Sequence, residues 1–407
     1  MSTIETALQP ETHSTTAAPA YNLSVGYLRA FITLLVVAHH AVLAYCPFVP
    51  PAEPASLLPQ PRWWQGFPVV DSHRWAGWQL FVGFNDMFFM SLMFFLSGLF
   101  VWTSLQRKGT STFLKDRLLR LGVPFVLAAA VVAPIAYYPT YLLTGGHGIA
   151  GFWQQWKQLG TWPAGPAWFV WVLLAFDAIV ALAYLVKPNF GDALARLADK
   201  SAERPFRLFT QLVFVSALAY VPLSLVIDPM WWSSWGPFFF QTGRILHYFV
   251  YFLAGIGVGA LGLNRGLLSA SGKLARRWGR WLTGAAVAFV FAVTVIGMAF
   301  AAQSQHQLWT IYGGLSFVFS CAASSFALMA IFVHFTRRRS AVWDSLTDNA
   351  YGIYLVHYAF VSWLQYSLLK FALPGFVKGL AVILAAVLLS WLTTAALRRI
   401  PAVARLI

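Results

Sequence analysis

Ten stretches of mostly apolar residues, each about 20 residues long, recur along the chain. A helix needs that length to cross the roughly 30 Å apolar core of a bilayer. The stretches are residues 25–46, 80–104, 118–143, 166–186, 208–227, 240–262, 281–301, 311–335, 349–371 and 376–397. Lipid admits only helices or closed barrels, and apolar runs this long are not barrel strands. The sequence therefore predicts an all-α polytopic membrane protein with about ten transmembrane helices.

Composition supports this fold class. Hydrophobic residues make up 59% of the chain and charged residues 10%, against about 45–50% and about 25% in soluble domains. A soluble protein of this size could not hide so much apolar surface in one core. Two cysteines, Cys46 and Cys321, are too few for a disulfide framework or a zinc site, so we expect small apolar core residues.

The net charge of +15 would suggest nucleic acid as a partner in a soluble protein. Here most of the 28 Lys and Arg residues fall in short runs between the apolar stretches, on the side that carries both termini. The positive-inside rule then predicts cytoplasmic N and C termini, with the bilayer and no nucleic acid as partner.

We expect three regions along the chain. Residues 1–24 are rich in Ser, Thr, Ala and Pro and lack a basic start, which predicts a disordered cytoplasmic tail rather than a signal peptide. Residues 25–397 form the transmembrane domain, and 398–407 form a second cytoplasmic tail. The outer connections 47–79 and 144–165 are rich in Trp, either as interfacial belt residues or as a lining for a sugar ring.

Ionisable residues inside the spans are candidates for function because burying them in lipid is costly. Arg29 and His40 are eleven residues apart, which is three helical turns plus about 20°, or about 16 Å of rise. They share one helix face, whereas His39 points about 100° away. If that face lines a cavity, Arg29 lies low and His40 high. The alternative for His40 is a buried histidine that only packs helices.

Asp86 lies in the second span at a depth close to that of His40, since one span ascends and the other descends. A carboxylate beside a histidine orients the ring and raises its basicity, so Asp86 is a candidate partner of His40. The alternative is that Asp86 bonds elsewhere or caps the outer end of its span.

Arg117 and Arg120 have the i, i+3 spacing that places two side chains on one helix face. Such a fork suits phosphate groups, although positive-inside charge also explains arginines at this position. Asp177 is either a packing contact or a cavity residue. Arg244 either binds an anionic group or snorkels, and His357 is a further intramembrane candidate.

No Walker loop, G-x-S-x-G, H-E-x-x-H or C-x-x-C motif occurs, which gives no support to ATPase, serine-hydrolase or zinc-protease chemistry. We expect no metal and no tightly bound cofactor. A multi-pass transporter or flippase of a sugar, lipid or drug is the alternative to an enzyme, because it would use the same buried polar groups. The lack of an internal repeat weakens that alternative.

Several segments together resemble the membrane acyltransferase-3 family, in family order from about residue 22 to 397. They are Tyr27-Leu28-Arg29 through His40, Phe94-Phe95-Leu96-Ser97-Gly98, Arg117-x-x-Arg120 before a Pro, Trp168-Phe169, Arg244 with Tyr248-Phe249, and Tyr351-Gly352-Ile353-Tyr354-Leu355-Val356-His357. The chain is loosely similar to the glucan succinyltransferase-like branch. The doubled His39-His40 departs from the usual single histidine.

The resemblance implies a fold of about ten transmembrane helices around a polar cavity. It also implies an acyltransferase that moves an acyl group from cytoplasmic acyl-CoA, either acetyl-CoA or succinyl-CoA, to a hydroxyl of a sugar or glycan. The acceptor would be met at the outer face of a bacterial inner membrane, as in O-acetylation of polysaccharides. It implies His40 as the base and Arg117, Arg120 and Arg29 as donor-binding residues. Arg244, Tyr354, His357 and Trp168 are further cavity candidates. With no esterase domain appended, a second transfer step would need a separate periplasmic partner.

Overall fold

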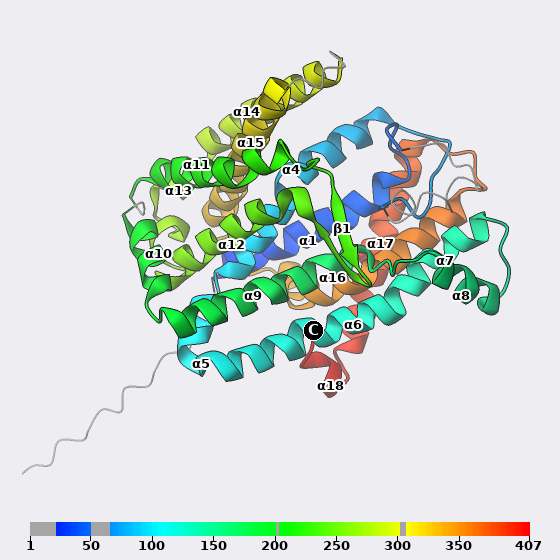
Figure 1. Ribbon diagram of the computed structural model, residues 1–407, viewed down its shortest axis with the longest axis horizontal. Helices are drawn as coiled ribbons and strands as arrows, with labels where there is room; N and C mark the ends of the chain where they lie inside the picture. The colour runs from blue at the N-terminus through cyan, green and yellow to red at the C-terminus, as the bar shows by residue number, and fades with distance from the viewer. Residues whose placement is uncertain (1–21, 50–65, 201–202, 302–306) are drawn as a thin grey trace, which may run out of the picture.

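The computed structural model describes residues 22–49, 66–200, 203–301 and 307–407. Its long helices lie side by side along the longest axis of the molecule (Figure 1). In chain order the elements are α1 (Leu23–Leu43), α4 (Ala76–Gly98), α5 (Val101–Arg117), η1 (Leu118–Gly122), α6 (Val123–Leu127), η2 (Ala128–Val132), α7 (Ala133–Leu143), α8 (Ile149–Gln158), η3 (Gly165–Ala167), α9 (Trp168–Val186), α10 (Phe190–Asp199), α11 (Pro205–Ser224), β1 (Trp232–Trp235), β2 (Phe238–Gln241), η4 (Thr242–Arg244), α12 (Ile245–Ala260), η5 (Gly266–Leu268), α13 (Lys273–Arg276), α14 (Trp278–Ala301), α15 (Gln307–Phe335), α16 (Ala341–Leu368), α17 (Gly375–Leu397) and α18 (Pro401–Ala404).

The all-α membrane fold is confirmed. Within the described residues, nine helical segments are long and apolar enough to cross a membrane. The tenth predicted span, 349–371, corresponds to α16, a helix of 28 residues whose polar side chains keep it out of that set. It nevertheless packs against α1, α7 and α17. The polar side chains of α16 therefore belong to the interior of the bundle, where the candidate site lies.

The third span differs most from its predicted range, 118–143. The helical run extends from Val101 to Leu143, with a break at Gly109, where φ is 71°, and two π-helical turns, η1 and η2. The run also contains Pro124 and Pro139. A proline has no N–H, so it removes the donor that a helix would supply to the carbonyl four residues earlier.

Side chains of α16 donate hydrogen bonds to the two helix carbonyls that these prolines leave without a backbone N–H donor. The Tyr351 hydroxyl donates to the Arg120 carbonyl, four residues before Pro124, over 2.8 Å. The Trp363 indole N–H donates to the Ile135 carbonyl, four residues before Pro139, over 3.0 Å. These two bonds fix α16 alongside the kinked helix, and thereby fix the height of every residue that α16 carries.

A β-hairpin interrupts the sequence between α11 and α12, where an apolar run had predicted that the sixth span begins at residue 240. Strands β1 and β2 pair antiparallel, with Trp232 opposite Gln241 and Trp235 opposite Phe238. The indole N–H of Trp171 on α9 donates to the Phe239 carbonyl over 2.7 Å. The hairpin is thereby attached to the first turn of α9.

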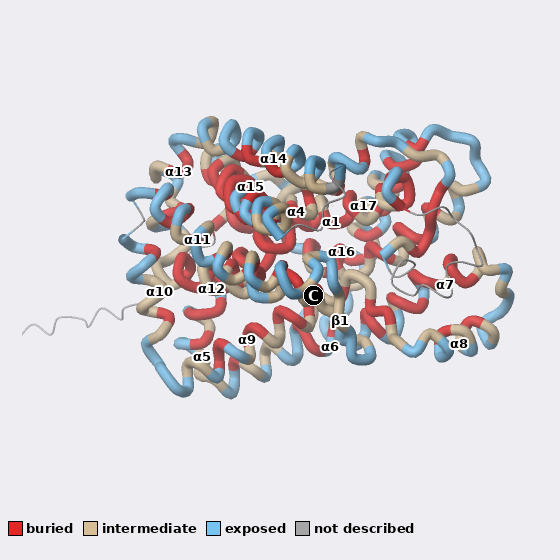
Figure 2. Tube along the Cα trace, turned by 45° about the horizontal axis from the view of Figure 1, so that its top comes forward, coloured by how far each residue is buried: buried red, intermediate tan, exposed pale blue. Residues whose placement is uncertain are grey.

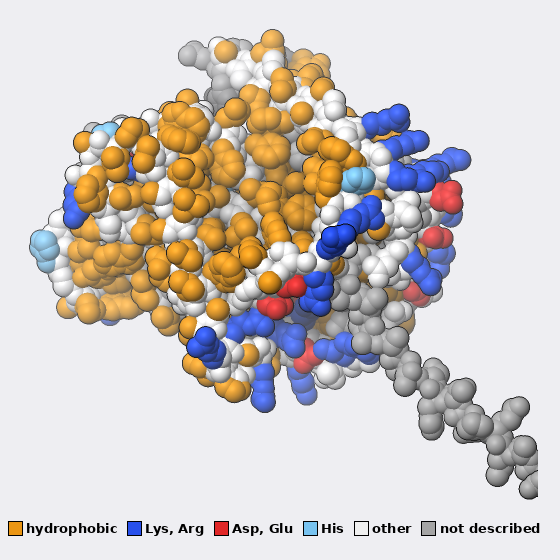
Figure 3. All heavy atoms as spheres, turned by 180° about the vertical axis from the view of Figure 1, so that it is seen from behind, with side chains coloured by type: hydrophobic (Ala, Val, Ile, Leu, Met, Phe, Trp, Pro, Cys, Tyr) orange, Lys and Arg blue, Asp and Glu red, His pale blue; other side chains and the backbone are white. Residues whose placement is uncertain are grey.

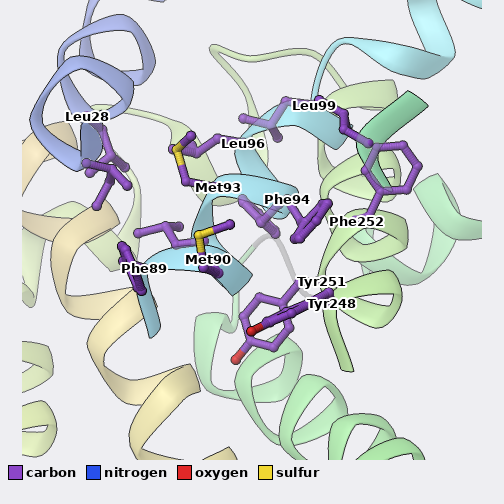
Figure 4. Close-up of a cluster of buried hydrophobic side chains, with 14 of the residues drawn as sticks. Leu28, Phe89, Met90, Met93, Phe94, Leu96, Leu99, Tyr248, Tyr251 and Phe252 are labelled. Carbon is purple, nitrogen blue, oxygen red and sulfur yellow. The ribbon is translucent and has the colours of Figure 1, made fainter. Parts of the chain in front are cut away.

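Helices α4 and α12 approach closely enough for backbone to meet backbone. A Cβ atom added to Gly255 would lie 2.1 Å from the Phe95 carbonyl oxygen, and one added to Gly259 would lie 2.0 Å from that of Leu99. Small residues four apart allow this approach between membrane helices. Aromatic and Met side chains fill the adjoining core, including Phe94 stacked on Tyr248 (Figure 4).

An ion pair buried at one end of the bundle connects distant parts of the chain. Lys378 Nζ on α17 lies 2.6 Å from Asp71 Oδ2, and both side chains are fully buried. The Asp71 backbone N–H donates to the Ala44 carbonyl just beyond α1.

Burial separates central from peripheral helices. Helices α1 and α4 are mostly buried, whereas α14 and α17 expose most of their apolar side chains (Figure 2). Hydrophobic side chains cover most of the face in Figure 3, and Lys and Arg side chains gather toward one end of it.

The cytoplasmic location of both termini stays a prediction. Residues 1–21 of the predicted tail, and Trp63 and Trp64 of the outer connection, lie outside the described residues.

We predict that Gly259→Ala destabilises the protein by about 1–3 kcal/mol, because the new methyl group overlaps the Leu99 carbonyl. The thermal unfolding temperature of detergent-solubilised protein measures the effect. Gly284→Ala in α14 is the matched control, since a Cβ there meets nothing within 4 Å and alanine favours the helix. Equal unfolding temperatures for the two variants would contradict the close approach of α4 and α12.

Candidate active site

His40 lies three residues before the end of α1, and its ring contacts α16. Its Nδ1 is 2.9 Å from the Val36 carbonyl oxygen and 3.2 Å from Nε2 of His357. The Gln365 amide donates to the His40 and Ala41 carbonyls, over 3.0 Å each. His40 is half-buried and His357 fully buried. The structure thus joins two residues that the sequence had indicated only separately.

His39 points to a different helix from His40. Its ring stacks on Phe89 of α4, with centroids 5.0 Å apart and planes at 24°. The His40 ring instead lies 5.1 Å from the His357 ring and 5.2 Å from that of Tyr358. This divergence agrees with the 100° step between neighbouring helical residues. It separates the role of His40 from that of His39.

Tyrosines on one face of α16 form the surroundings of the histidine pair. The Tyr354 hydroxyl donates to the Pro166 carbonyl in η3. The neighbouring Gly165 has φ of +56°, and a Cβ there would lie 3.1 Å from the Tyr358 ring. The connection into α9 therefore bends inward to contact α16 beside His357, and Tyr354 is held there by backbone.

Arg117 is in contact with an acidic partner on α9. Its Nε lies 3.2 Å from Oδ2 of Asp177, which is fully buried, and its guanidinium lies 4.9 Å over the Phe113 ring. The contact is made through Nε, not through the terminal NH₂ groups. Asp177, for which the sequence left two roles open, is therefore the counter-ion of Arg117.

Arg120 differs from Arg117 in its surroundings. Its side chain is exposed, and it belongs to the π-helical turn η1. A π-turn has i→i+5 hydrogen bonds and is wider than an α-helical turn, so the i, i+3 rule that predicts a single fork does not apply here. The expectation of one α-helical face is wrong at this point. Arg29 on α1 is also exposed.

Asp86 was expected to orient His40, and that expectation is wrong. Oδ2 of Asp86 lies 2.8 Å from Nη2 of Arg244, and Nη1 of Arg244 donates to the Asp86 backbone carbonyl over 3.1 Å. Arg244 is buried and also lies over the Phe317 ring. The open alternative, that Asp86 bonds elsewhere, is the one that the structure supports.

Trp168 begins α9 and packs against the hairpin and α12. Its ring centroid is 5.1 Å from that of Trp232 on β1 and 6.0 Å from that of Tyr248 on α12. The Tyr248 hydroxyl donates to Gln241 over 2.8 Å. Trp168 is half-buried, so this aromatic cluster offers partly exposed ring surface close to Arg244.

A groove of about 470 Å³ lies between α1, α4 and α17, but its lining is apolar. It includes Ala38, Trp78 and Trp391 and does not include His40. This groove is therefore not the polar cavity that the family resemblance implies, and that cavity stays a prediction. Among the Trp residues of connection 144–165, Trp156 is buried against Phe152 and Tyr137, which makes it a packing residue.

The pattern of the acyltransferase domain called Acyl_transf_3 matches residues 22–395, nearly the whole chain. The chain belongs to the acyltransferase-3 family. It is a membrane acyltransferase, and this membership favours the enzyme over the transporter. No curated protein and no solved structure matches the chain. The similarity to the glucan succinyltransferase-like branch stays a prediction.

Two features of this acyltransferase were missed in the sequence. The pairing of Asp177 with Arg117 spans two helices, and neither residue signals the other by spacing. The link between His40 and His357 was also missed, although both are histidines within predicted spans, which is a usable signal. Buried polar groups remain near Arg244, because His247 and Asn85 are fully buried with no hydrogen-bond partner among the described residues.

We predict that Asp86 and Arg244 are energetically coupled by about 1–3 kcal/mol, because each is the other's charged partner. The double-mutant cycle compares Asp86→Ala, Arg244→Met and the two combined, using unfolding of detergent-solubilised protein. Either single change leaves one charge unpaired, and the double change removes both. Additive effects of the two changes would contradict the pairing.

Proposed function

We propose that this acyltransferase transfers an acyl group from cytoplasmic acyl-CoA, of the acetyl- or succinyl-CoA class, to a hydroxyl of a sugar or glycan. We further propose that it acts in a bacterial inner membrane and meets the acceptor at the outer face. The observation that carries the proposal is His40, a half-buried imidazole in the last turn of a membrane helix, which is hydrogen-bonded to a second imidazole. A general base for a hydroxyl group needs such a site.

Donor binding is proposed at the arginines below His40. Tyr351, which bonds the Arg120 carbonyl, precedes His357 by six residues, or about 9 Å along α16. Arg120 is therefore displaced along the bundle from the histidine pair. Its exposed guanidinium, with that of Arg29 and the terminal NH₂ groups of Arg117, suits the phosphates of CoA. The acyl-bearing arm would then extend toward His40.

The chemical step follows from these positions. His40 takes the proton of the acceptor hydroxyl as the oxygen attacks the thioester carbonyl. The C–S bond breaks when the tetrahedral intermediate collapses, and the departing thiolate takes the proton from His40. An ester and free CoA remain. Arg244 stays a candidate for stabilising the oxyanion. Tyr354 does not, because its hydroxyl proton is donated to the Pro166 carbonyl. An acyl-histidine intermediate is the covalent variant.

We predict that His40→Ala lowers acyl transfer by about 100-fold or more, because general-base catalysis contributes about 10²–10⁴. CoA release from acyl-CoA in membrane vesicles measures it, and mass spectrometry of surface glycans detects the missing ester. The matched control is His39→Ala, whose ring stacks on Phe89 and which should keep most of the activity. Turnover near the wild-type rate in His40→Ala would sink this assignment.

We predict that Arg120→Ala raises the KM for acyl-CoA by about tenfold or more, since a hydrogen bond to a charged group contributes about 1.5–3 kcal/mol. kcat should change less, because the arginine binds the donor remote from the reacting carbonyl. Arg338→Ala is the control, an exposed arginine in the connection after α15. An unchanged KM in Arg120→Ala would remove the arginine from the donor site.

A further inference from the structure

The hydrogen bonds around His357 determine which of its ring nitrogens carries a proton. Nδ1 of His357 lies 2.7 Å from the Tyr354 carbonyl oxygen. A carbonyl only accepts, so Nδ1 must be the protonated nitrogen. In a neutral imidazole the other nitrogen then holds a lone pair. Nε2 of His357, the atom that faces His40, is therefore an acceptor.

The same reasoning applies to His40. Its Nδ1 faces the Val36 carbonyl at 2.9 Å and Nε2 of His357 at 3.2 Å. Both of these atoms are acceptors, so Nδ1 of His40 must carry the proton. The lone pair of neutral His40 is then on Nε2. Nε2 is the nitrogen that these two contacts leave for another partner.

We propose that His357 is the positioning residue that makes His40 a base. Its Nε2 accepts the Nδ1–H of His40, which fixes the ring and selects the tautomer with the lone pair on Nε2. The inference rests on the proposed function, because it is in that reaction that the Nε2 lone pair of His40 takes the proton of the acceptor hydroxyl. When it does, the Nδ1–H stays bonded to the same two acceptors.

The usual partner for such a histidine is a carboxylate, but the neighbouring carboxylates are engaged elsewhere. Asp86 pairs with Arg244, and Asp177 pairs with Arg117. The titratable groups whose rings face His40 are His357 and Tyr358 on α16, and its own neighbour His39. A neutral imidazole is also less costly to bury in a membrane bundle than an unpaired carboxylate.

The backbone of α16 supports this role. His357 lies between Tyr351 and Trp363, whose side chains bond the carbonyls of Arg120 and Ile135. Gln365 bonds the carbonyls of His40 and Ala41. Contacts on both sides of His357 therefore fix its height against α1.

The test replaces the acceptor nitrogen while keeping the volume of the side chain. His357→Phe has no acceptor, so we expect kcat to fall about 10–100-fold with the KM for acyl-CoA little changed. The acidic limb of the pH–rate profile should move to lower pH, because protonated His40 loses one acceptor. In His357→Gln the amide oxygen can accept in place of Nε2. This variant should therefore keep much of the activity, with the acidic limb of its pH–rate profile close to that of the wild type. A purely structural role would not move the limb.

The matched control is His247→Phe, which removes another fully buried histidine, one with no hydrogen-bond partner among the described residues. Its pH–rate profile should match that of the wild type. Wild-type turnover and an unshifted limb in His357→Phe would overturn the inference. So would equal losses in the Phe and Gln variants when both unfold at the wild-type temperature.

A measurement without substrate separates this inference from the proposed function. ¹⁵N NMR of histidine-labelled protein, with the His40 signals assigned from His40→Asn, reports which ring nitrogen is protonated. We expect Nδ1–H in the wild type and a mixture of tautomers in His357→Phe. A wild-type protein in which Nε2 of His40 carries the proton would overturn the inference. A wild-type protein in which Nδ1 carries the proton, but which transfers no acyl group, would support the hydrogen-bond chain and contradict the proposed function.

Discussion

The geometry of the site depends on two hydrogen bonds to helix carbonyl groups. Each of these carbonyls lacks its usual backbone donor because a proline lies four residues further along the chain. Inside a membrane an unbonded carbonyl is costly, since no water can satisfy it. Pro124 and Pro139 remove two such donors, and Tyr351 and Trp363 supply them from α16. The kinked third span and α16 are consequently fixed in register at two heights. His357, between those heights, then meets His40 on α1.

The predictable part of the fold was the part encoded locally. A run of apolar residues long enough to cross a bilayer reveals its helix without reference to the rest of the chain, which is why the spans were found. The hairpin was missed because each of its strands has only four residues, far fewer than the run of about 20 apolar residues that reveals a membrane helix. Its strand pairing depends on neighbours such as Trp171, which lies 68 positions away from its acceptor, Phe239.

For the site, the sequence indicated residues but not their partners. Depth arguments placed His40 and Asp86 at similar heights, yet they say nothing about direction around the bundle, and Asp86 points to Arg244 instead. The spacing of Arg117 and Arg120 assumed an α-helix, whereas the chain forms a π-turn there. An intramembrane histidine was a sound signal in both cases, because His40 and His357 do meet.

The ion pair between Asp71 and Lys378 has a consequence for biosynthesis. The two residues are separated by 307 positions, and the later one belongs to α17, the last of the long helices described. Until α17 has been synthesised, Asp71 lacks Lys378, its ion-pair partner. We therefore expect the segment that follows α1 to dock against Ala44 late, so that the helix bearing His40 is secured only near the end of translation.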